Sequence, residues 1–579
     1  MNSSRFRILL NYLSPYQKKI FFGILNLIIA NALIAYIPLL IRDEVNNLKT
    51  IPSLSQIALN ATLILFFASL QWGTEFLYRG LLFEVALNVE FDNKQKLFSH
   101  LLEMDTFFFS KNKIGDLINR ATSDITQVRY LIVFIFISLI NAIFAYAFTL
   151  PIMLSINFSL SLLVILIFLF LPLIVHFIRD KLNIEQHIIQ KELSNLSTLI
   201  QEDINGISVI KMYVQEDNEC RSFHITNQKL LKANIRLAKI QNILLPALKA
   251  IGGICLVVII WLGSINITND NYLNSGNFIA LILYVERLIY PTALIGISLA
   301  TYQTSKVSFD RVEAILKLNS QIKSSPNAIP LLRHKVKGRF TAENLNFTYP
   351  NSTKIILKNI NFTINPGETI AIVGPINSGK STLIKTFPRL LNIESRQLYL
   401  DNIDITKLRL QSLRETIAYV PQETVLFKTT IENNIRYGNP LAKLEEVKKA
   451  AMYARIHDEI LNFPKQYNTI VGTGGSKLSG GQQLRISLAR AILMDAPIII
   501  LDSPLSSIDN QISTDILENL VKHTKQKTII LVTHQISVAS IADRVFVMEQ
   551  GQISERGTHE ELVRKSSFYR LLWNQQQQR

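Results

Sequence analysis

A glycine-rich segment, TIAIVGPINSGKST, has the residue types that bind a nucleotide phosphate. An apolar, strand-like run leads into the pattern GxxxxGKS and a helical pattern follows it, which is the context that this motif requires. Backbone N–H groups of such a loop surround phosphate, Lys380 neutralises its oxygens, and the Ser381 hydroxyl ligates Mg²⁺. The residues predicted to bind the nucleotide here are Gly374, Pro375, Ile376, Asn377, Ser378, Gly379, Lys380, Ser381 and Thr382.

A second apolar run, IIILDSPLSSID at residues 498 to 509, ends in an acidic residue. Any core strand can end in aspartate, but together with the phosphate loop Asp502 indicates the second group on the metal side. Ser503 stands where a hydrolytic site needs a carboxylate. A serine hydroxyl can hydrogen-bond the attacking water but does not accept its proton near neutral pH, and loss of a positioned base costs about 10²–10⁴-fold in rate. The segment predicts nucleotide binding with impaired hydrolysis.

A third motif, KLSGGQQLRISLARAIL at residues 477 to 493, begins with glycines that let the backbone approach a phosphate. Ser479 is expected to cap the helix that follows. With these motifs the whole chain resembles the ATP-binding cassette transporters, and in particular an exporter half-transporter similar to multidrug exporters and lipid A flippases. In that family LSGGQ, here residues 478–482 and called the signature motif below, contacts ATP held by the opposite subunit. The resemblance therefore implies ATP contacts from Ser479, Gly480, Gly481 and Gln482.

Four further positions are implied by the same resemblance. Tyr349 in NFTYP matches the aromatic residue that stacks on adenine, and Gln422 in VPQE matches the glutamine that touches the metal and the membrane-domain interface. Asp509 in SSID matches the aspartate that crosses between cassettes, and His534 in LVTHQ matches the histidine that contacts the γ-phosphate. Taken alone, the tyrosine has the alternative of a strand-edge residue, and a lone histidine is more often structural. The implied Mg²⁺ ligands are Ser381, Gln422 and Asp502.

Three residues depart from the family pattern. Asn377 replaces a glycine, and asparagine tolerates positive φ, so phosphate binding should survive. Thr473 replaces a glutamate common near the signature motif, which weakens a cross-domain contact. Ser503 replaces the glutamate that polarises the attacking water. Asymmetric pairs in the family often combine one degenerate and one competent site, so an intact signature motif here is suited to complete the site of a partner.

The elements that carry these motifs predict a multidomain fold: an all-α six-helix transmembrane domain followed by an α/β P-loop nucleotide-binding domain. Strand-like runs alternate with helical patterns after residue 336, as in a parallel α/β sheet. The Ser/Pro/Asn-rich segment NSQIKSSPNAIP marks the boundary. The expected divisions are a transmembrane domain at 1–318, a linker at 319–335, a cassette at 336–573 and a disordered tail at 574–579.

Six apolar runs approach the length of about 20 residues that crosses a bilayer. They lie near 20–41, 57–78, 131–154, 158–178, 244–265 and 278–300. An even count puts both termini on one side, and the short loops contain only Arg42 and Lys49 as basic residues, so the positive-inside rule places the termini and the cassette in the cytoplasm. The first run reads as an uncleaved span. We expect a multi-pass protein of the bacterial inner (plasma) membrane.

The composition agrees with a membrane protein. Hydrophobic residues make up 48% of the 579 residues, and the formal charge is +16. That charge fits basic cytoplasmic faces better than nucleic-acid binding, because no interleaved basic and aromatic strand is present. Only Cys220 and Cys255 occur, so no disulfide framework is expected.

Ionisable residues within spans are candidates for substrate contact, because burying them is costly. Lys249 lies in the fifth span, and Glu286 and Arg287 lie in the sixth. Lys249 and Glu286 differ in depth by roughly 12 Å at ~1.5 Å per residue, so they do not form an obvious ion pair. Glu286 and Arg287 differ by about 100° in direction, so one is free to face substrate while the other pairs with a helix. A purely structural role for both stays open.

Two polar loops, 105–117 and 209–219, resemble the cytoplasmic loops that press on the cassettes in this family. Phe107 to Phe109 are expected to insert into a cassette groove or to pack within their own helix.

The resulting hypothesis is ATP-driven export of a hydrophobic or amphipathic substrate, a lipid or a drug, by one half of a dimer within the lipid bilayer. A heterodimeric partner is favoured. The alternatives are a slowly cycling homodimer and an ATP-gated regulatory subunit that does not pump.

Overall fold

The computed structural model describes residues 3–47, 54–268, 274–350, 352–502, 510–523, 526–565 and 567–577. The chain forms two compact units. The membrane unit comprises Met1–Leu102 and Lys113–Leu318, and the cassette unit comprises Glu103–Asn112 and Asn319–Arg579. A short stretch from the first half of the chain therefore belongs to the cassette unit.

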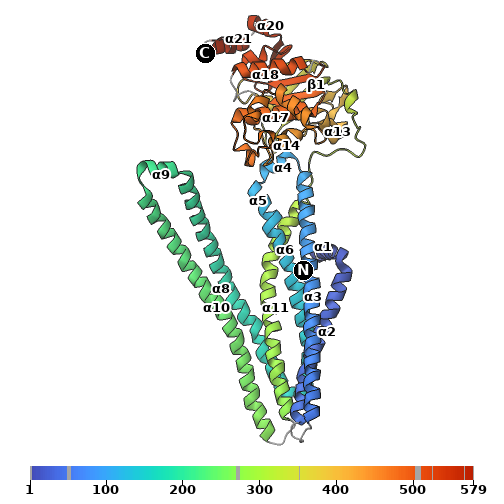
Figure 1. The fold of residues 1–579 in the computed structure, drawn as a ribbon, viewed down its shortest axis with the longest axis vertical. Helices are drawn as coiled ribbons and strands as arrows, with labels where there is room; N and C mark the ends of the chain where they lie inside the picture. The colour runs from blue at the N-terminus through green and yellow to red at the C-terminus, as the bar shows by residue number, and fades with distance from the viewer. Residues whose placement is uncertain are drawn as a thin grey trace. The chain divides into compact units, whose positions relative to one another are not determined.

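The membrane unit is entirely helical in the residues described (Figure 1). Its helices are α1 (Ser3–Leu13), η1 (Ser14–Tyr16), α2 (Gln17–Asn47), α3 (Leu54–Leu102), α5 (Ile114–Asn119), η2 (Arg120–Asp124), α6 (Ile125–Ile132), η3 (Val133–Leu139), α7 (Ile140–Ile156), α8 (Phe158–Asn205), α9 (Ile207–Tyr213), α10 (Glu216–Thr268) and α11 (Ser275–Leu316). The segments η2 and η3 are π-helical turns within one continuous rod from α5 to α7.

Each of the six expected spans lies within one of these rods, in chain order α2, α3, the end of α6 with η3 and α7, α8, α10 and α11. By length and composition, four helical stretches qualify as membrane spans among the residues described: Arg7–Asn47, Ser55–Leu102, Ile114–Ile156 and Ser275–Ile295. Shorter apolar stretches are Phe158–Phe168 in α8 and Ala250–Leu262 in α10. The rods α8 and α10 extend well beyond these apolar parts, as the polar loops predicted.

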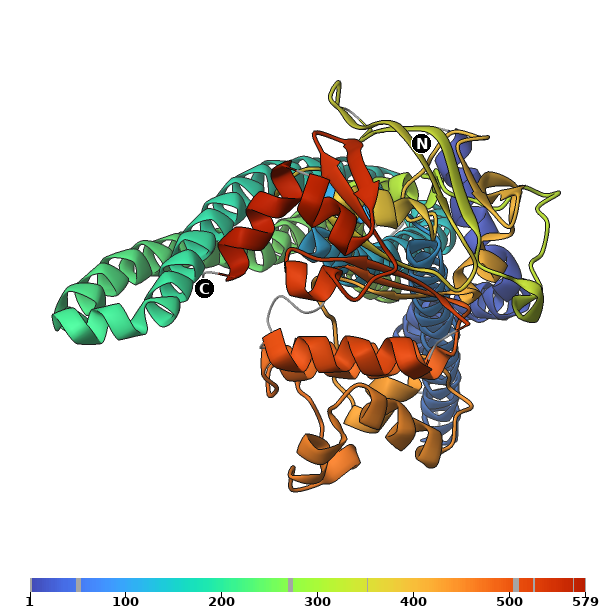
Figure 2. The same cartoon turned by 90° about the horizontal axis from the view of Figure 1, so that it is seen from above.

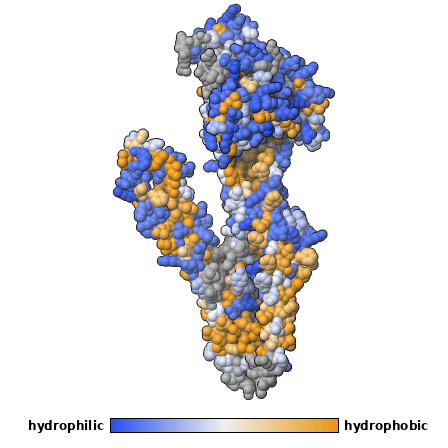
Figure 3. All heavy atoms as spheres, in the orientation of Figure 1, coloured by the Kyte–Doolittle hydropathy of each residue, from blue (hydrophilic) through white to orange (hydrophobic). Residues whose placement is uncertain are grey.

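The apolar surface of the membrane unit faces outward. Trp72 on α3 is 70% exposed and Trp261 on α10 is 66% exposed. Figure 3 shows apolar side chains over the visible face of the lower part of this unit, whereas hydrophilic residues cover most of the visible face of the cassette unit. Large exposed apolar side chains on helices of this length are stable in lipid and not in water.

Buried charges hold the polar ends of these helices together. Glu90 on α3 accepts a hydrogen bond from Arg129 Nη1 on α6 at 2.8 Å. Asp124 in η2 is buried and accepts from Ser308 Oγ on α11 at 2.7 Å, with Arg311 at 3.6 Å. Paired in this way, the carboxylates tie α3, α6 and α11 into one bundle.

The cassette unit contains two sheets. The six-stranded sheet has the order β10-β9-β3-β8-β7-β6, and all its pairs are parallel except β9 with β10. Its strands are β3 (Thr369–Val373), β6 (Ile417–Val420), β7 (Ile498–Asp502), β8 (Thr528–Val532), β9 (Arg544–Glu549) and β10 (Gln552–Gly557). The second sheet, β1 (Phe340–Thr348), β2 (Ile355–Ile364), β4 (Leu398–Leu400) and β5 (Ile403–Asp404), is antiparallel and was not predicted from the sequence.

Helices surround these sheets, as the view in Figure 2 shows from above. They are α4 (Thr106–Lys111), η4 (Arg333–Lys335), α12 (Lys380–Thr386), η5 (Ile405–Lys407), α13 (Leu410–Glu415), α14 (Ile431–Arg436), α15 (Leu444–Tyr453), α16 (His457–Leu461), η6 (Gln466–Asn468), η7 (Thr473–Gly475), α17 (Gly480–Met494), α18 (Asn510–His523), α19 (Ile536–Ala539), α20 (His559–Lys565) and α21 (Ser567–Gln577).

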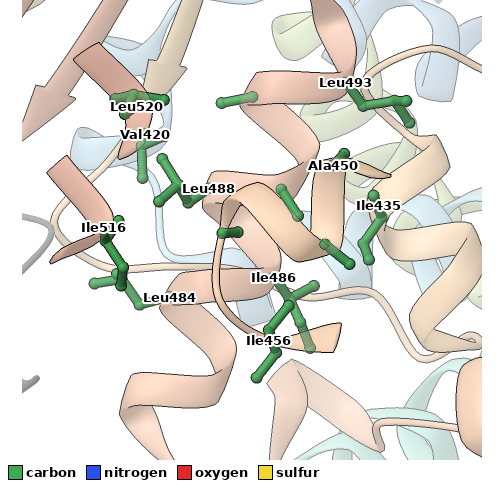
Figure 4. Close-up of a cluster of buried hydrophobic side chains, with 14 of the residues drawn as sticks. Val420, Ile435, Ala450, Ile456, Leu484, Ile486, Leu488, Leu493, Ile516 and Leu520 are labelled. Carbon is green, nitrogen blue, oxygen red and sulfur yellow. The ribbon is translucent and has the colours of Figure 1, made fainter. Parts of the chain in front are cut away.

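The central sheet is buried on both faces, which explains its uninterrupted apolar strands. Ile499 and Leu501 of β7 join one hydrophobic cluster, and their neighbours Ile498 and Ile500 join another on the opposite face. Figure 4 shows the first cluster, in which α17 contributes Leu484, Ile486 and Leu488. This packing fixes α17, the helix that begins with the signature motif, to the rest of the cassette unit.

The structure differs from the expected organisation in two segments. Within 319–335, the expected linker, Ile329 N donates to Lys407 O at 2.9 Å and so joins the cassette unit. Residues 574–577, expected to be disordered, continue helix α21, while 578–579 lie outside the described residues. The prediction of disorder was wrong for 574–577 because it used composition alone, and tertiary contacts of this helix, described below, stabilise it.

Candidate functional site

The phosphate loop leaves the buried strand β3 and ends at the first residue of α12. Gly374 has φ +152, and a Cβ there would lie 2.1 Å from the Met548 carbonyl oxygen, so only glycine fits. Gly379 has φ +97 directly before the helix. Asn377 has φ +64, the left-handed conformation that asparagine was expected to supply in place of glycine.

Lys380 closes the loop on itself. Its Nζ donates to Gly374 O at 2.9 Å, to Pro375 O at 2.7 Å and to Ser378 Oγ at 3.2 Å. Burial lowers the pKa of this ammonium to about 8. The three hydrogen-bond acceptors of this buried ammonium are neutral, so an additional anion would stabilise its charged form, and a phosphate is the anion that this loop fits.

Ser381 and Asp502 lie together at the ends of α12 and β7. Ser381 Oγ donates to Asp502 Oδ1 at 2.8 Å, and Asp502 is only 2% exposed. A hydroxyl and a carboxylate oxygen are the hard ligands that Mg²⁺ prefers, so this pair fits the implied metal. Gln422, the third implied ligand, lies exposed in the loop after β6.

A residue that the sequence analysis missed completes this group. Tyr419 of β6 donates its hydroxyl proton to Asp502 Oδ2 at 3.2 Å, and burial together with Asp502 raises the pKa of the phenol. Two features could have identified Tyr419: it directly precedes VPQE in the sequence, and its strand pairs with β7. Sequence spacing alone does not show that β6 and β7 are adjacent.

His534 follows β8 and lies at the same edge of the sheet. Desolvation and the charge of Lys380 lower the pKa of this imidazole below its ordinary value. The imidazole also hydrogen-bonds the backbone of Gly374, so the structure brings His534 to the phosphate loop. A neutral imidazole at this place can donate one hydrogen bond to a phosphate oxygen.

Tyr349 lies after β1, with its hydroxyl 3.2 Å from Thr382 Oγ1 and its ring edge-on to Phe347 at 5.0 Å between centroids. The aromatic ring is therefore beside the phosphate-binding helix. Its predicted stacking on adenine stays a prediction.

The signature motif begins α17 as expected. Gln482 N donates to Ser479 Oγ at 3.3 Å, and Ser479 N donates to Gln482 Oε1 at 3.0 Å, which makes a capping box. Glu459 of α16 accepts from Gln482 Nε2 at 2.9 Å and pairs with Arg485 Nη1 at 2.6 Å. Ser479 and Gly480 themselves are exposed. Among the residues described, no hydrogen bond joins the signature motif to the phosphate loop of the same chain.

Two predicted positions, Ser503 and Asp509, lie outside the described residues. Thr473, the third departure from the family pattern, is exposed in η7. The described geometry therefore supports phosphate and metal binding, and it does not include Ser503 at the position of the base.

The helix α4 contacts the cassette unit to which it belongs. Thr106 Oγ1 donates to Leu390 O at 2.9 Å, and Asp105 Oδ2 accepts from Gln321 N at 2.8 Å. Phe108 is buried, and Phe107 lines a cavity of about 490 Å³ together with Tyr349. The predicted contact of this loop with a cassette groove therefore has direct geometric support, whereas Phe109 is 41% exposed.

The charged residues of the sixth span have different surroundings. Arg287 Nη2 donates to Asn31 O of α2 at 3.0 Å, whereas Glu286 is exposed. Lys249 lies in α10, and its side chain is outside the description. This arrangement fits the alternative in which Arg287 pairs with a neighbouring helix and Glu286 is free.

Comparisons with known proteins agree with this geometry. The family description "ABC transporter transmembrane region" matches residues 20–292, and "ABC transporter" matches residues 357–506. An ATP-dependent lipid A-core flippase of Desulfotalea psychrophila is 32% identical over 97% of each chain. A putative multidrug export ATP-binding/permease protein of Staphylococcus aureus is 32% identical over 98% of each. The solved structure of a bacterial Atm1-family ABC exporter with ATP bound has a similar fold, with a TM-score of 0.80 at 21% identity over 97% of this chain and 98% of that one.

Proposed function

We propose that this chain is one half of an asymmetric dimeric exporter. It belongs to the ATP-binding cassette transporters, and its relatives indicate an exporter: a multi-pass membrane protein that moves substrate outward at the expense of ATP, with the cassette in the cytoplasm. The observation that carries this proposal is a complete phosphate-binding set, Lys380, Ser381 and Asp502, followed by Ser503 where a base is needed. Such a site binds ATP with Mg²⁺ and hydrolyses it slowly.

The partner in this proposal is a second half-transporter that retains the base. The exposed, capped signature motif supports this pairing, because the N-terminus of α17 offers N–H groups to a phosphate held by another chain. In the assembled site, His534 contacts the γ-phosphate, Tyr349 stacks on adenine, Gln422 approaches the metal, and Asp509 crosses to the partner.

The proposed substrate is hydrophobic or amphipathic, such as a lipid or a drug. Two similar proteins are named for lipid A-core flipping and multidrug export, and the membrane helices expose extensive apolar surface. Within this proposal Glu286 is the group that meets a cationic or hydrogen-bonding part of the substrate.

Two measurements test the proposal. The full-length chain, purified alone in detergent, should bind a labelled ATP analogue and turn over very slowly, whereas addition of its partner should restore hydrolysis. Robust turnover by the isolated chain, lost in Lys380→Ala, would contradict the asymmetric pairing and support a homodimer. Inverted vesicles that contain both subunits should accumulate substrate with ATP. Absence of flux despite ATP binding would identify a regulatory subunit instead.

A further inference from the structure

The C-terminal helix α21 packs back onto the central sheet. Tyr569 is fully buried in a cluster that includes Val373 of β3 and Val547 of β9. Its hydroxyl lies 2.8 Å from His559 Nδ1, and the Trp573 ring meets the same imidazole edge-on at 4.8 Å between centroids. These contacts fix the position of the last turn of the helix.

That last turn reaches the segment of the γ-phosphate histidine. Gln576 Nε2 donates to the His534 carbonyl oxygen at 2.7 Å, and Ile536 N donates to Gln576 Oε1 at 2.7 Å. One amide side chain therefore binds two backbone groups on either side of Gln535.

The second of these bonds satisfies a group that would otherwise lack a partner. Ile536 is the first residue of α19, and the first N–H groups of a helix have no acceptor within it. Gln535 at the N-cap position makes no side-chain cap bond. Gln576 supplies the cap from a different part of the chain.

The backbone of the histidine segment, residues 533–536, makes few other hydrogen bonds. Thr533 N donates to Ile372 O at 3.2 Å and so belongs to the sheet, and Gln535 N donates to the Thr533 hydroxyl at 3.0 Å. Between Thr533 and Ile536, it is Gln576 that hydrogen-bonds the His534 backbone from another part of the chain. The orientation of the imidazole depends on that backbone together with the hydrogen bond between the ring and the Gly374 backbone.

We propose that Gln576 is a positioning residue that holds the His534 backbone, so that α21 sets how the histidine meets the γ-phosphate. This inference rests on the proposed contact of His534 with that phosphate. It gives the glutamine-rich end of the chain a role in distinguishing ATP from ADP, since only ATP has the group that His534 recognises.

The test uses the full-length chain in detergent with Gln576→Met, which keeps the length of the side chain but removes both hydrogen bonds. Gln575→Met is the matched control, because Gln575 is exposed on the same helix and points about 100° away. The first measurement is amide exchange of a peptide covering residues 533–540. The second is the ratio of ATP and ADP dissociation constants, compared with that of His534→Ala.

We expect Gln576→Met to accelerate exchange at Ile536 and to reduce the preference for ATP by about three- to tenfold, the effect of one or two hydrogen bonds. The control should change neither. Unchanged amide exchange in Gln576→Met would overturn the contact. If Gln576→Met exchanges faster but keeps the ATP/ADP ratio, while His534→Ala reduces that ratio, the positioning role would be overturned. An unchanged ratio in His534→Ala would instead overturn the proposed role of His534, and the inference with it.

Discussion

The phosphate-loop half and the signature half of the nucleotide machinery satisfy their polar groups in opposite ways. Lys380 and Asp502 are buried and hydrogen-bonded within the chain. Ser479 and Gly480 are exposed, and the buried support of their helix comes from Glu459 and Arg485 behind them. The first half is preformed around the position of a phosphate, whereas the second presents an exposed helix end, which in the proposed dimer would meet a nucleotide held by another chain. Four substitutions test this contrast.

The largest effect is expected for Ser479→Ala in the assembled dimer. Loss of the cap and of the Ser479 hydroxyl should reduce ATP hydrolysis by about 10²-fold, because in the proposed pairing the competent site includes this motif. Ser476→Ala, an exposed serine just before the motif, is the control. Steady-state ATPase assays with both subunits measure the change, and full activity in Ser479→Ala would contradict the shared site.

Lys380→Ala should affect binding in the isolated chain. Removal of the ammonium that three acceptors now hold should weaken ATP binding by about 10-fold or more, because the phosphate loop loses its one long cationic side chain. Lys358→Ala, an exposed lysine of β2, should bind normally. Equilibrium binding of a labelled analogue distinguishes them, and equal affinities would remove the basis for the site.

A smaller effect is expected for Tyr419→Phe. This change removes one oxygen, the donor to Asp502 Oδ2, and should raise the Mg²⁺ concentration needed for half-maximal ATP binding by about threefold. Tyr399→Phe, whose hydroxyl bonds to the Arg396 carbonyl oxygen elsewhere, is the control. A Mg²⁺ titration that is identical for both variants would show that Tyr419 does not orient the aspartate.

The smallest effect is expected for Asn377→Gly. Glycine adopts φ near +64 without strain, so ATP affinity should stay within about twofold of the original. Asn377→Val should instead weaken binding, because a β-branched residue in the left-handed region costs about 1–3 kcal/mol. Binding titrations of the pair test whether the loop needs this conformation, and equal affinities would show that it does not.

The parts that could be predicted from the sequence are those whose signal is local. GxxxxGKS after an apolar strand specified the loop around Lys380, and the serine before two glycines specified the cap at Ser479. The six apolar runs likewise predicted the rods of the membrane unit, because lipid leaves few alternatives to a helix.

The parts that were missed depend on contacts between distant segments. Tyr419 reaches Asp502 only because β6 and β7 are neighbours in the sheet. In the antiparallel sheet, β1 pairs with β4, although the phosphate loop lies between these two strands in the sequence. The glutamine-rich end was predicted to be disordered from its composition, but Tyr569 anchors that helix in a core formed by other strands. Local patterns carry no information about such partners.

The paired rods α8 and α10 have a mechanical consequence. They run side by side, with α9 at their common end (Figures 1 and 2). The 48 residues of α8 make a rod about 72 Å long at ~1.5 Å per residue. A tilt of only about 5° at one end of such a rod moves the other end by about 6 Å, roughly one helical turn. Exposed Met212, Tyr213 and Val214 stand at that far end. In a hairpin of this length, a small rotation among the membrane helices would therefore displace the far end by about one helical turn.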